Sequence, residues 1–183
     1  MRKKPKILST TIAAKTQVFC VESMQLEFSN GVRRTYERLK AGKNGAVMIV
    51  PIDSKGNLIL IREYAAGTEK YELAFPKGLI EPDETALQAA NRELKEEVGF
   101  GAKQLTYLKP ITLAPGYLSH TMYMVLAEDL YAEKLEGDEP EEIEICYWPL
   151  NDKQRLLQQP DFTEARSIAA LYMVDDLLKQ RTK

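Results

Sequence analysis

The clearest pattern of hydrophobic and polar positions lies in residues 85–98. Apolar side chains recur there every three or four positions, at Leu87, Ala90, Leu94 and Val98. This spacing predicts an amphipathic helix whose apolar stripe faces a core. Thr85, with Gln88 three residues later, forms a capping-box pattern at the start, and Gly99 supplies the stop.

Short strands are predicted on both sides of this helix. Residues 17–28 and 32–39 read as two strands around the turn signal Asn30-Gly31, which makes an N-terminal hairpin. Residues 1–15 show no period and are expected to form a short, partly mobile lead-in. Other apolar runs predict strands at residues 45–51, 58–64, 71–75, 104–113, 122–127 and 143–148.

The last part of the chain is expected to be helical. Asn151 is placed to cap a short helix that ends at residue 158, before Pro160. Apolar residues at helical spacing predict a longer helix at residues 163–179. Many short strands with one central and one terminal helix indicate an α/β layered domain built on a mixed sheet.

Composition indicates an ordinary globular protein. The chain has 183 residues, 44% hydrophobic and 28% charged, which suits one domain with a substantial core. Its formal net charge of −2 and lack of a basic tract argue against nucleic-acid binding. No apolar run approaches the ~18 residues of a membrane span, and no signal-like segment follows Met1. Cys20 and Cys146 form no metal-binding pattern, so a reducing cytoplasm is the expected location.

Three carboxylates lie on one flank of the predicted helix. Glu93, Glu96 and Glu97 stand at i, i+3 and i+4, with only Lys95 and Arg92 nearby to offset them. Like charges at this spacing destabilise a helix by about 0.2–0.5 kcal/mol per pair. A solvated acidic face is the alternative. A hard divalent cation would remove the repulsion by taking the carboxylate oxygens as ligands, so the pattern favours a metal site.

The stretch around these acids matches a known motif. The pattern G-x5-E-x7-R-E-U-x-E-E-x-G-U is met at Gly78, Glu84, Arg92, Glu93, Leu94, Glu96, Glu97 and Gly99. Phe100 fills the last apolar slot, where an aliphatic residue is usual, and is the only departure. The chain therefore resembles the Nudix hydrolases. The resemblance implies an α/β/α sandwich over about residues 40–183 and hydrolysis of a pyrophosphate bond.

The resemblance also implies roles for the box residues. Glu93 and Glu97 would bind the metal, Glu96 would bind it directly or through water, and the main-chain carbonyl of Lys77 would join them. Two or three Mg²⁺ or Mn²⁺ ions per site would neutralise the pyrophosphate and activate water. Arg92 would orient the acids, and Glu97 and Arg92 count among the catalytic residues.

Two further box residues would support the site from its edge. Gly78 is the box glycine at the entry to the motif. Glu84 stands at the helix start, where it would act from the second shell of the metal. A simpler role for Glu84, favouring the helix dipole, stays open.

The catalytic base is expected in an acidic loop before the last strand, where the ADP-ribose pyrophosphatase branch of the family carries it. Residues 137–142 occupy that place. Glu141 is favoured over Glu139, and the further candidates are Asp138, Glu142 and Glu144. A merely solvated acidic loop is the alternative. His120, the one histidine of the chain, is expected to be structural.

Features outside the box point to the substrate class. The N-terminal strands resemble the sheet of the ADP-ribose pyrophosphatase branch, which packs across a homodimer, so residues 1–39 are expected to be a dimer-forming β extension. Pro115, sixteen residues after Gly99, is similar to that branch. Pro76-Lys77 and Tyr117 resemble diadenosine polyphosphate hydrolases. The mixture implies a small-molecule nucleotide substrate: ADP-ribose, NADH or diadenosine triphosphate, cleaved to release AMP.

Substrate contacts are expected from aromatic and basic side chains. The candidate adenine platforms are Tyr36, Tyr64 and Tyr117. The candidate phosphate contacts are Arg38, Lys40, Arg62 and Lys77. Arg62 is needed in particular because Ala65 stands where the ADP-ribose branch often has arginine.

Three other functions are compatible with this fold. A non-catalytic ADP-ribose sensor would usually have lost the box glutamates, and all of them are present. An isopentenyl diphosphate isomerase of the same fold would need more histidines than His120. A nucleoside-triphosphate pyrophosphatase of the same fold stays open at this stage.

Overall fold

The protein is described by a computed structural model that covers residues 3–42 and 44–181. Contacts between Cα atoms divide the chain into two compact units. Unit 1 comprises Met1–Gly45 and Thr112–Thr121, and unit 2 comprises Ala46–Ile111 and Met122–Lys183. The two units are described separately below.

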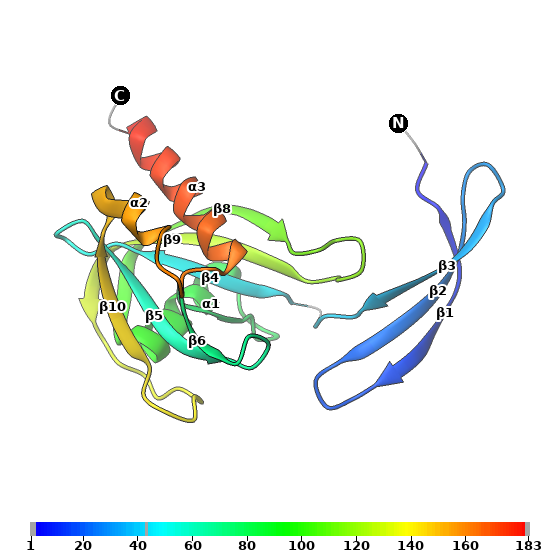
Figure 1. The fold of residues 1–183 in the computed structure, drawn as a ribbon, viewed down its shortest axis with the longest axis horizontal. Coiled ribbons are helices and arrows are strands. Elements are labelled where there is room, and N and C mark those ends of the chain that lie inside the picture. The colour runs from blue at the N-terminus through cyan, green and yellow to red at the C-terminus, as the bar shows by residue number, and fades with distance from the viewer. Residues whose placement is uncertain (1–2, 43, 182–183) are drawn as a thin grey trace. The chain divides into compact units, whose positions relative to one another are not determined.

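Unit 1 is built on a three-stranded antiparallel sheet (Figure 1). Its strands, in spatial order, are β1 (Lys6–Lys15), β2 (Cys20–Glu27) and β3 (Arg33–Leu39). The predicted hairpin of β2 and β3 is present, but the predicted aperiodic lead-in at residues 1–15 is wrong for residues 6–15. Every residue of β1 is exposed, so backbone pairing with β2 forms this strand without any apolar alternation in the sequence.

Unit 2 contains two sheets. One has the order β10 (Glu144–Pro149), β5 (Asn57–Ala65), β6 (Lys70–Ala74), and all its pairs are antiparallel. The other has the order β7 (Lys77–Leu79), β4 (Ala46–Pro51), β9 (Thr121–Ala132), β8 (Phe100–Thr112). Because β4 pairs parallel with β9 and antiparallel with β7, the sheet is mixed, as predicted.

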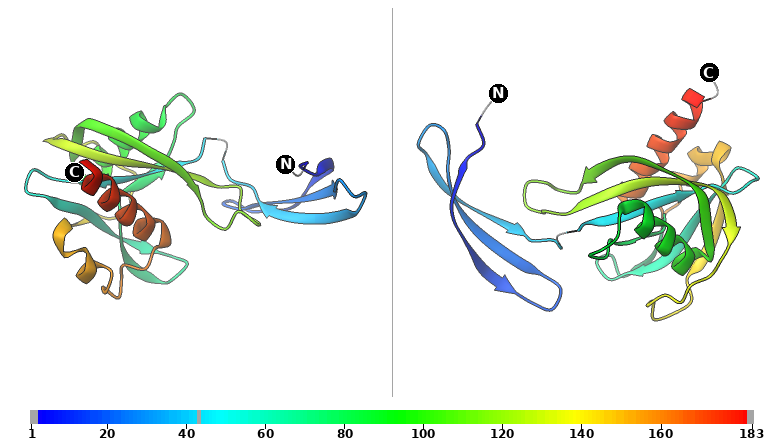
Figure 2. Two further views of the ribbon diagram at one scale, coloured as in Figure 1. Left: turned by 90° about the horizontal axis from the view of Figure 1, so that it is seen from above. Right: turned by 180° about the vertical axis from the view of Figure 1, so that it is seen from behind.

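Helices cover opposite faces of β4, which is buried over its whole length. Val47 and Ile49 pack in the cluster that contains the apolar side of α1 (Ala86–Glu93), whereas Met48 and Val50 pack in the cluster that contains α3 (Ala165–Arg181). The views in Figure 2 show α1 in green and α3 in red on the two sides of this strand. The predicted α/β/α layering is therefore confirmed.

The segment before α3 differs from its prediction. It begins with a 3-10 turn, η2 (Leu150–Asp152), and continues as the short helix α2 (Lys153–Leu156). No side chain caps α2, so the predicted capping role of Asn151 is wrong. Between residues 3 and 181, leaving aside residue 43, none of the helices has both the length and the apolar character that a membrane crossing requires.

Candidate active site

The site is built on the end of α1. The capping box predicted at Thr85 is present: its Oγ1 accepts from the Gln88 N–H at 3.3 Å, and the Gln88 side chain accepts from the Thr85 N–H at 2.9 Å. After Glu93 the helix widens into the π-turn η1 (Leu94–Val98), a local form that is frequent at functional sites. Gly99 ends it in the left-handed region, with φ 78°, as predicted.

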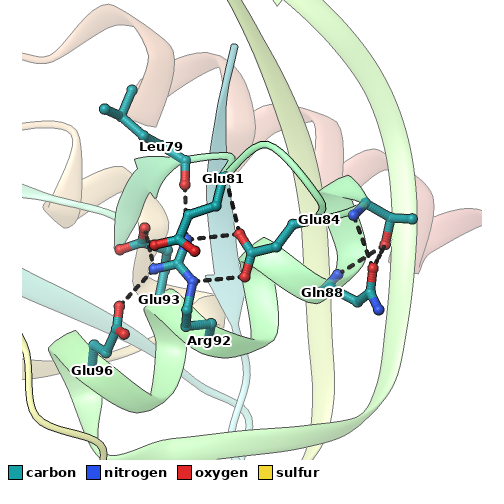
Figure 3. Close-up of polar contacts among 8 residues, drawn as sticks. Leu79, Glu81, Glu84, Gln88, Arg92, Glu93 and Glu96 are labelled. Atoms are coloured by element: carbon teal, nitrogen blue, oxygen red, sulfur yellow. Dashed lines mark hydrogen bonds and ion pairs between the residues drawn. The ribbon is translucent and has the colours of Figure 1, made fainter. Parts of the chain in front are cut away.

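Arg92 gathers three of the box carboxylates around one guanidinium (Figure 3). It donates two hydrogen bonds to Glu84, at 2.7 and 2.9 Å, and its Nη1 donates to Glu93 at 2.8 Å and to Glu96 at 2.7 Å. Its Nη2 also donates to the main-chain oxygen of Leu79 at 2.9 Å. The hydrogen bonds from Arg92 lower the pKa of Glu84. This arrangement suits the orienting role expected for Arg92.

Glu93 and Glu97 are buried acids. Glu97 is 4% exposed, and burial raises its pKa to about 8, although the Lys77 side-chain charge and the Lys77 N–H, at 2.9 Å, favour the charged form. Burial also raises the pKa of Glu93, against the opposing effect of Arg92. The pKa of each buried acid is raised, which means that the surrounding side chains supply too little positive charge to offset the burial of two carboxylates.

Gly78 leaves room for one of these acids. A Cβ at this position would overlap the carboxylate of Glu93, so no other residue fits while Glu93 keeps its place. Gly78 is paired with Val47 of β4, which fixes the glycine backbone against the central strand. The box glycine is thus required by the packing of Glu93.

The oxygen-rich donor set suits a divalent cation such as Mg²⁺, with Glu93 and Glu97 as its buried core. Within residues 3–42 and 44–181, no three acidic, histidine or cysteine side chains converge closely enough to form a ready metal site. Arg92 holds oxygens of Glu93 and Glu96 that a bound cation would need. The residues fit a cation provided that Arg92 releases part of this contact.

A cavity of about 800 Å³ joins the box to the acidic loop. Its lining includes Glu93, Glu96, Glu97 and residues 136–140 of the loop. Glu139 is part of this lining, whereas Glu141 lines a second cavity of about 640 Å³ that also contains Glu96 and Glu97. Glu139 lines this second cavity as well, so both candidate base residues share a cavity with Glu96 and Glu97.

Glu141 is contacted by Tyr71, a residue that the sequence does not single out. The hydroxyl of Tyr71 on β6 donates to the Glu141 carboxylate at 2.6 Å, and this contact raises the pKa of Tyr71. Tyr64 packs edge-on against Tyr71, with ring centroids 5.6 Å apart. A contact between positions 70 residues apart leaves no mark in a single sequence.

The predicted phosphate contacts of unit 2 are engaged with carboxylates. The Lys77 ammonium pairs with Glu63 at 2.7 Å, and both side chains line the 800 Å³ cavity. Arg62 pairs with Asp161 at 2.9 Å and with Glu144. Glu144 is therefore held beside Arg62 on the sheet. Glu63 is a cavity residue that sequence reasoning missed.

The candidate contacts of unit 1 form their own cluster. Glu22, 5% exposed, pairs with Lys40 and Arg38, each at 2.7 Å, and its pKa is lowered by Lys40 first and then by Arg38. A cavity of about 220 Å³ within this unit is lined by Met24, Tyr36, Glu37, Arg38 and residues 115–119. It thus brings together Tyr36, Arg38 and Tyr117. His120 is half-buried in the same unit.

The chain is similar to known proteins over nearly its whole length. Residues 42–171 match the family described as NUDIX domain, and residues 5–38 match the NudE-type Nudix hydrolase N-terminal domain. The chain is 57% identical to the ADP compounds hydrolase NudE of Escherichia coli, over 96% of this chain and 94% of that protein. It is 30% identical to an ADP-ribose pyrophosphatase of Bacillus subtilis, over 91% and 92% of the two chains.

A solved structure is similar over nearly its whole length. The crystal structure of an ADP compounds hydrolase superposes with a TM-score of 0.93 at 56% identity, covering 99% of this chain and 97% of the other. The fold and the family predicted from the sequence are both confirmed by these matches.

Proposed function

The chain belongs to the Nudix family of hydrolases, and on this premise we propose that it cleaves the pyrophosphate bond of ADP-containing compounds and releases AMP. The observation that carries the reaction type is the complete box, in which Glu93 is buried against Arg92 and Glu97 is buried against the Lys77 N–H. The substrate class is supported by 57% identity to a protein named as an ADP compounds hydrolase. ADP-ribose, NADH and diadenosine triphosphate are the substrates to test.

The proposed cofactor is Mg²⁺ or Mn²⁺, with two or three ions per site. Glu93 and Glu97 would hold the metal with the main-chain carbonyl of Lys77, and Glu96 would join directly or through water. A bound divalent cation supplies charge neutralisation and an activated water in such sites. Arg92 would orient two of these acids, Glu93 and Glu96, through its hydrogen bonds to them.

The proposed base is Glu141, with Glu139 as the second candidate. A carboxylate at this point accepts the proton of the attacking water, and such a base typically contributes 10²–10⁴-fold to the rate. We expect Glu141→Gln to lower kcat by about 100-fold or more, and Glu139→Gln to lower it less. Near wild-type kcat in Glu141→Gln would show that the base lies elsewhere.

Candidate substrate contacts are proposed in each unit separately. In unit 2, Lys77 and Arg62 would supply positive charge for a phosphate, and in unit 1 Arg38 and Lys40 are the corresponding candidates. Tyr64, Tyr117 and Tyr36 supply aromatic surface for the adenine. Support comes from the exposure of Tyr64 and Tyr117, at 51% and 62%, which leaves both rings accessible to a ligand.

The assembly is proposed to be a homodimer formed through the β extension at residues 1–39, with residues 40–183 as the hydrolase domain. Apolar side chains of the extension are exposed, including Ile7, Ile12, Val18 and Phe19. A small-molecule nucleotide is the proposed ligand, rather than a nucleic acid or a membrane. The two free cysteines agree with a reducing compartment such as the cytoplasm.

One substrate panel tests the proposed function. The protein is incubated with Mg²⁺ and, separately, with ADP-ribose, NADH, diadenosine triphosphate and the common nucleoside triphosphates, with and without a chelator. We expect AMP from the ADP compounds and none once the metal is chelated. Pyrophosphate from a nucleoside triphosphate, without AMP from ADP-ribose, would replace this proposal with a nucleoside-triphosphate pyrophosphatase. Binding of ADP-ribose without turnover would indicate a sensor.

A further inference from the structure

The acidic loop is joined to the end of the box helix by three consecutive residues. The Glu133 N–H donates to the Gly99 carbonyl at 3.1 Å, and the Leu135 N–H donates to the Lys95 carbonyl at 3.2 Å. Between them, the Lys134 ammonium donates to the Glu96 carbonyl. Residues 133–135, the root of the acidic loop, are thus hydrogen-bonded one after another to the π-turn and to Gly99.

Side-chain contacts reinforce the same junction. Lys95 pairs with the Glu133 carboxylate at 3.0 Å. The stem of Lys134 lies over Gly99, where an added Cβ would approach it to 3.4 Å. A cation bonded to a carbonyl of the last helical turn is favoured by the helix dipole. Lys134 therefore contributes a charge-assisted contact at the point where the loop leaves the helix.

Lys134 also lies among the acids of the site. It lines the 640 Å³ cavity together with Glu96, Glu97, Glu139 and Glu141. Loop residues 136–140, which begin two positions after it, line the 800 Å³ cavity of the box. The junction made by Lys134 therefore lies between the box carboxylates and the loop carboxylates.

We propose that Lys134 is a positioning residue of the hydrolase, which ties the root of the acidic loop to the Glu96 carbonyl and so aligns the loop base with the metal-binding acids. This inference rests on the proposed function, because it takes the base from that loop. Proton transfer needs the base within hydrogen-bond reach of the attacking water, so a loosened loop lowers the rate of the chemical step.

The test compares Lys134→Met, Lys134→Arg and the control Lys103→Met. Lys103 is a lysine of β8 with an exposed ion pair to Asp129 at 3.7 Å. We expect Lys134→Met to lower kcat about tenfold, with KM within about threefold and the melting temperature almost unchanged, because Lys134 is exposed. Lys134→Arg keeps the donor and should recover most of the rate, and Lys103→Met should match the wild type.

A double-mutant cycle shows whether Lys134 acts through the base. In the Glu141→Gln background, Lys134→Met should add little, because residues that act as a unit are not additive. If Glu141→Gln is active, the cycle is made with Glu139→Gln. A full additional tenfold loss would overturn the inference, as would a kcat of Lys134→Met within twofold of the wild type, or a rise in KM alone, which would indicate a direct phosphate contact.

Failure of the proposed function gives a different result. If the wild type releases no AMP from ADP-ribose, the substrate class is wrong whatever Lys134 does. The same variants are then compared on whichever substrate of the panel is hydrolysed. The comparison stays valid because Lys134 contacts the root of the loop and not the substrate's leaving group.

Discussion

Gly78 shows at the scale of one residue why the box requires a glycine. Its backbone φ is not in the left-handed region, so the requirement is not conformational. It is steric, because a Cβ would occupy the place of the Glu93 carboxylate. The end of a glutamate side chain can move aside, so the effect of a substitution should fall on the site and not on the fold.

We therefore predict that Gly78→Ala lowers kcat by about 100-fold, while the free energy of unfolding changes by about 1 kcal/mol or less. The matched control is Gly67→Ala, because nothing lies within 4 Å of a Cβ at that loop position. Steady-state kinetics and urea unfolding measure the two quantities. Equal activity of the two variants would mean that Glu93 is not held against Gly78.

The raised pKa of Glu97 should make the stability of the folded protein depend on pH. Its pKa of about 8 in the folded protein lies above its ordinary value of 4.5. The folded state then binds the proton more tightly than the unfolded state, so this contribution to stability is full below pH 4.5 and is lost as the pH rises through about 8. Metal binding has the opposite dependence, because a ligand carboxylate must be ionised.

With chelator present, the melting temperature of the wild type should fall between about pH 6 and pH 9, and that of Glu97→Gln should fall less. Added Mg²⁺ should raise the wild-type melting temperature more at the higher pH. Thermal unfolding at both pH values, with and without metal, measures this. Identical pH profiles for the two proteins would show that Glu97 does not titrate in this range.

At the scale of secondary structure, local signals were readable and distant ones were not. The capping box at Thr85 and the stop at Gly99 involve neighbours in sequence, and both were predicted. The strand β1 was missed because all its residues are exposed and it depends only on pairing with β2. Asn151 looked like a cap, but the 3-10 turn there leaves its side chain unused.

The site shows the same division. Glu93, Glu96 and Glu97 are adjacent on one helix, so their grouping could be inferred from spacing, although the π-turn could not. The residues that contact the loop or its start come from β6 and from the segment after β9, as in the contact of Tyr71 with Glu141. Pairings across tens of residues carry no periodicity, so only the fold reveals them.

The same core substitution should affect activity differently in the two helical layers. Leu94 and Leu171 are both fully buried, but Leu94 lies in the π-turn and packs with α1, whereas Leu171 packs on the α3 side. Each Leu→Ala change should destabilise the protein by about 2–5 kcal/mol. Below the melting temperature, Leu94→Ala should also lower kcat about tenfold or more, and Leu171→Ala should keep it. Equal kcat for the two variants would show that the π-turn does not affect catalysis.

At the scale of the whole molecule, the β extension has more apolar surface than its own sheet can bury. Ile7 and Ile12 on β1 are 61% and 62% exposed, and Phe19, beside β2, is 59% exposed. A three-stranded sheet is near the lower limit of independent stability, so exposed apolar residues on it favour association with another chain. A second copy of this chain is the simplest partner, because self-association needs no further component.

The double substitution Ile7→Glu/Ile12→Glu should therefore convert a dimer into a monomer without unfolding unit 2. Both residues are exposed in the single chain, so the charges cost little there but would be buried unpaired between two copies. Light scattering at low micromolar concentration gives the mass, and Tyr172→Glu, at a 49% exposed tyrosine of α3, is the control that should stay dimeric. A wild type of monomeric mass would contradict the dimer.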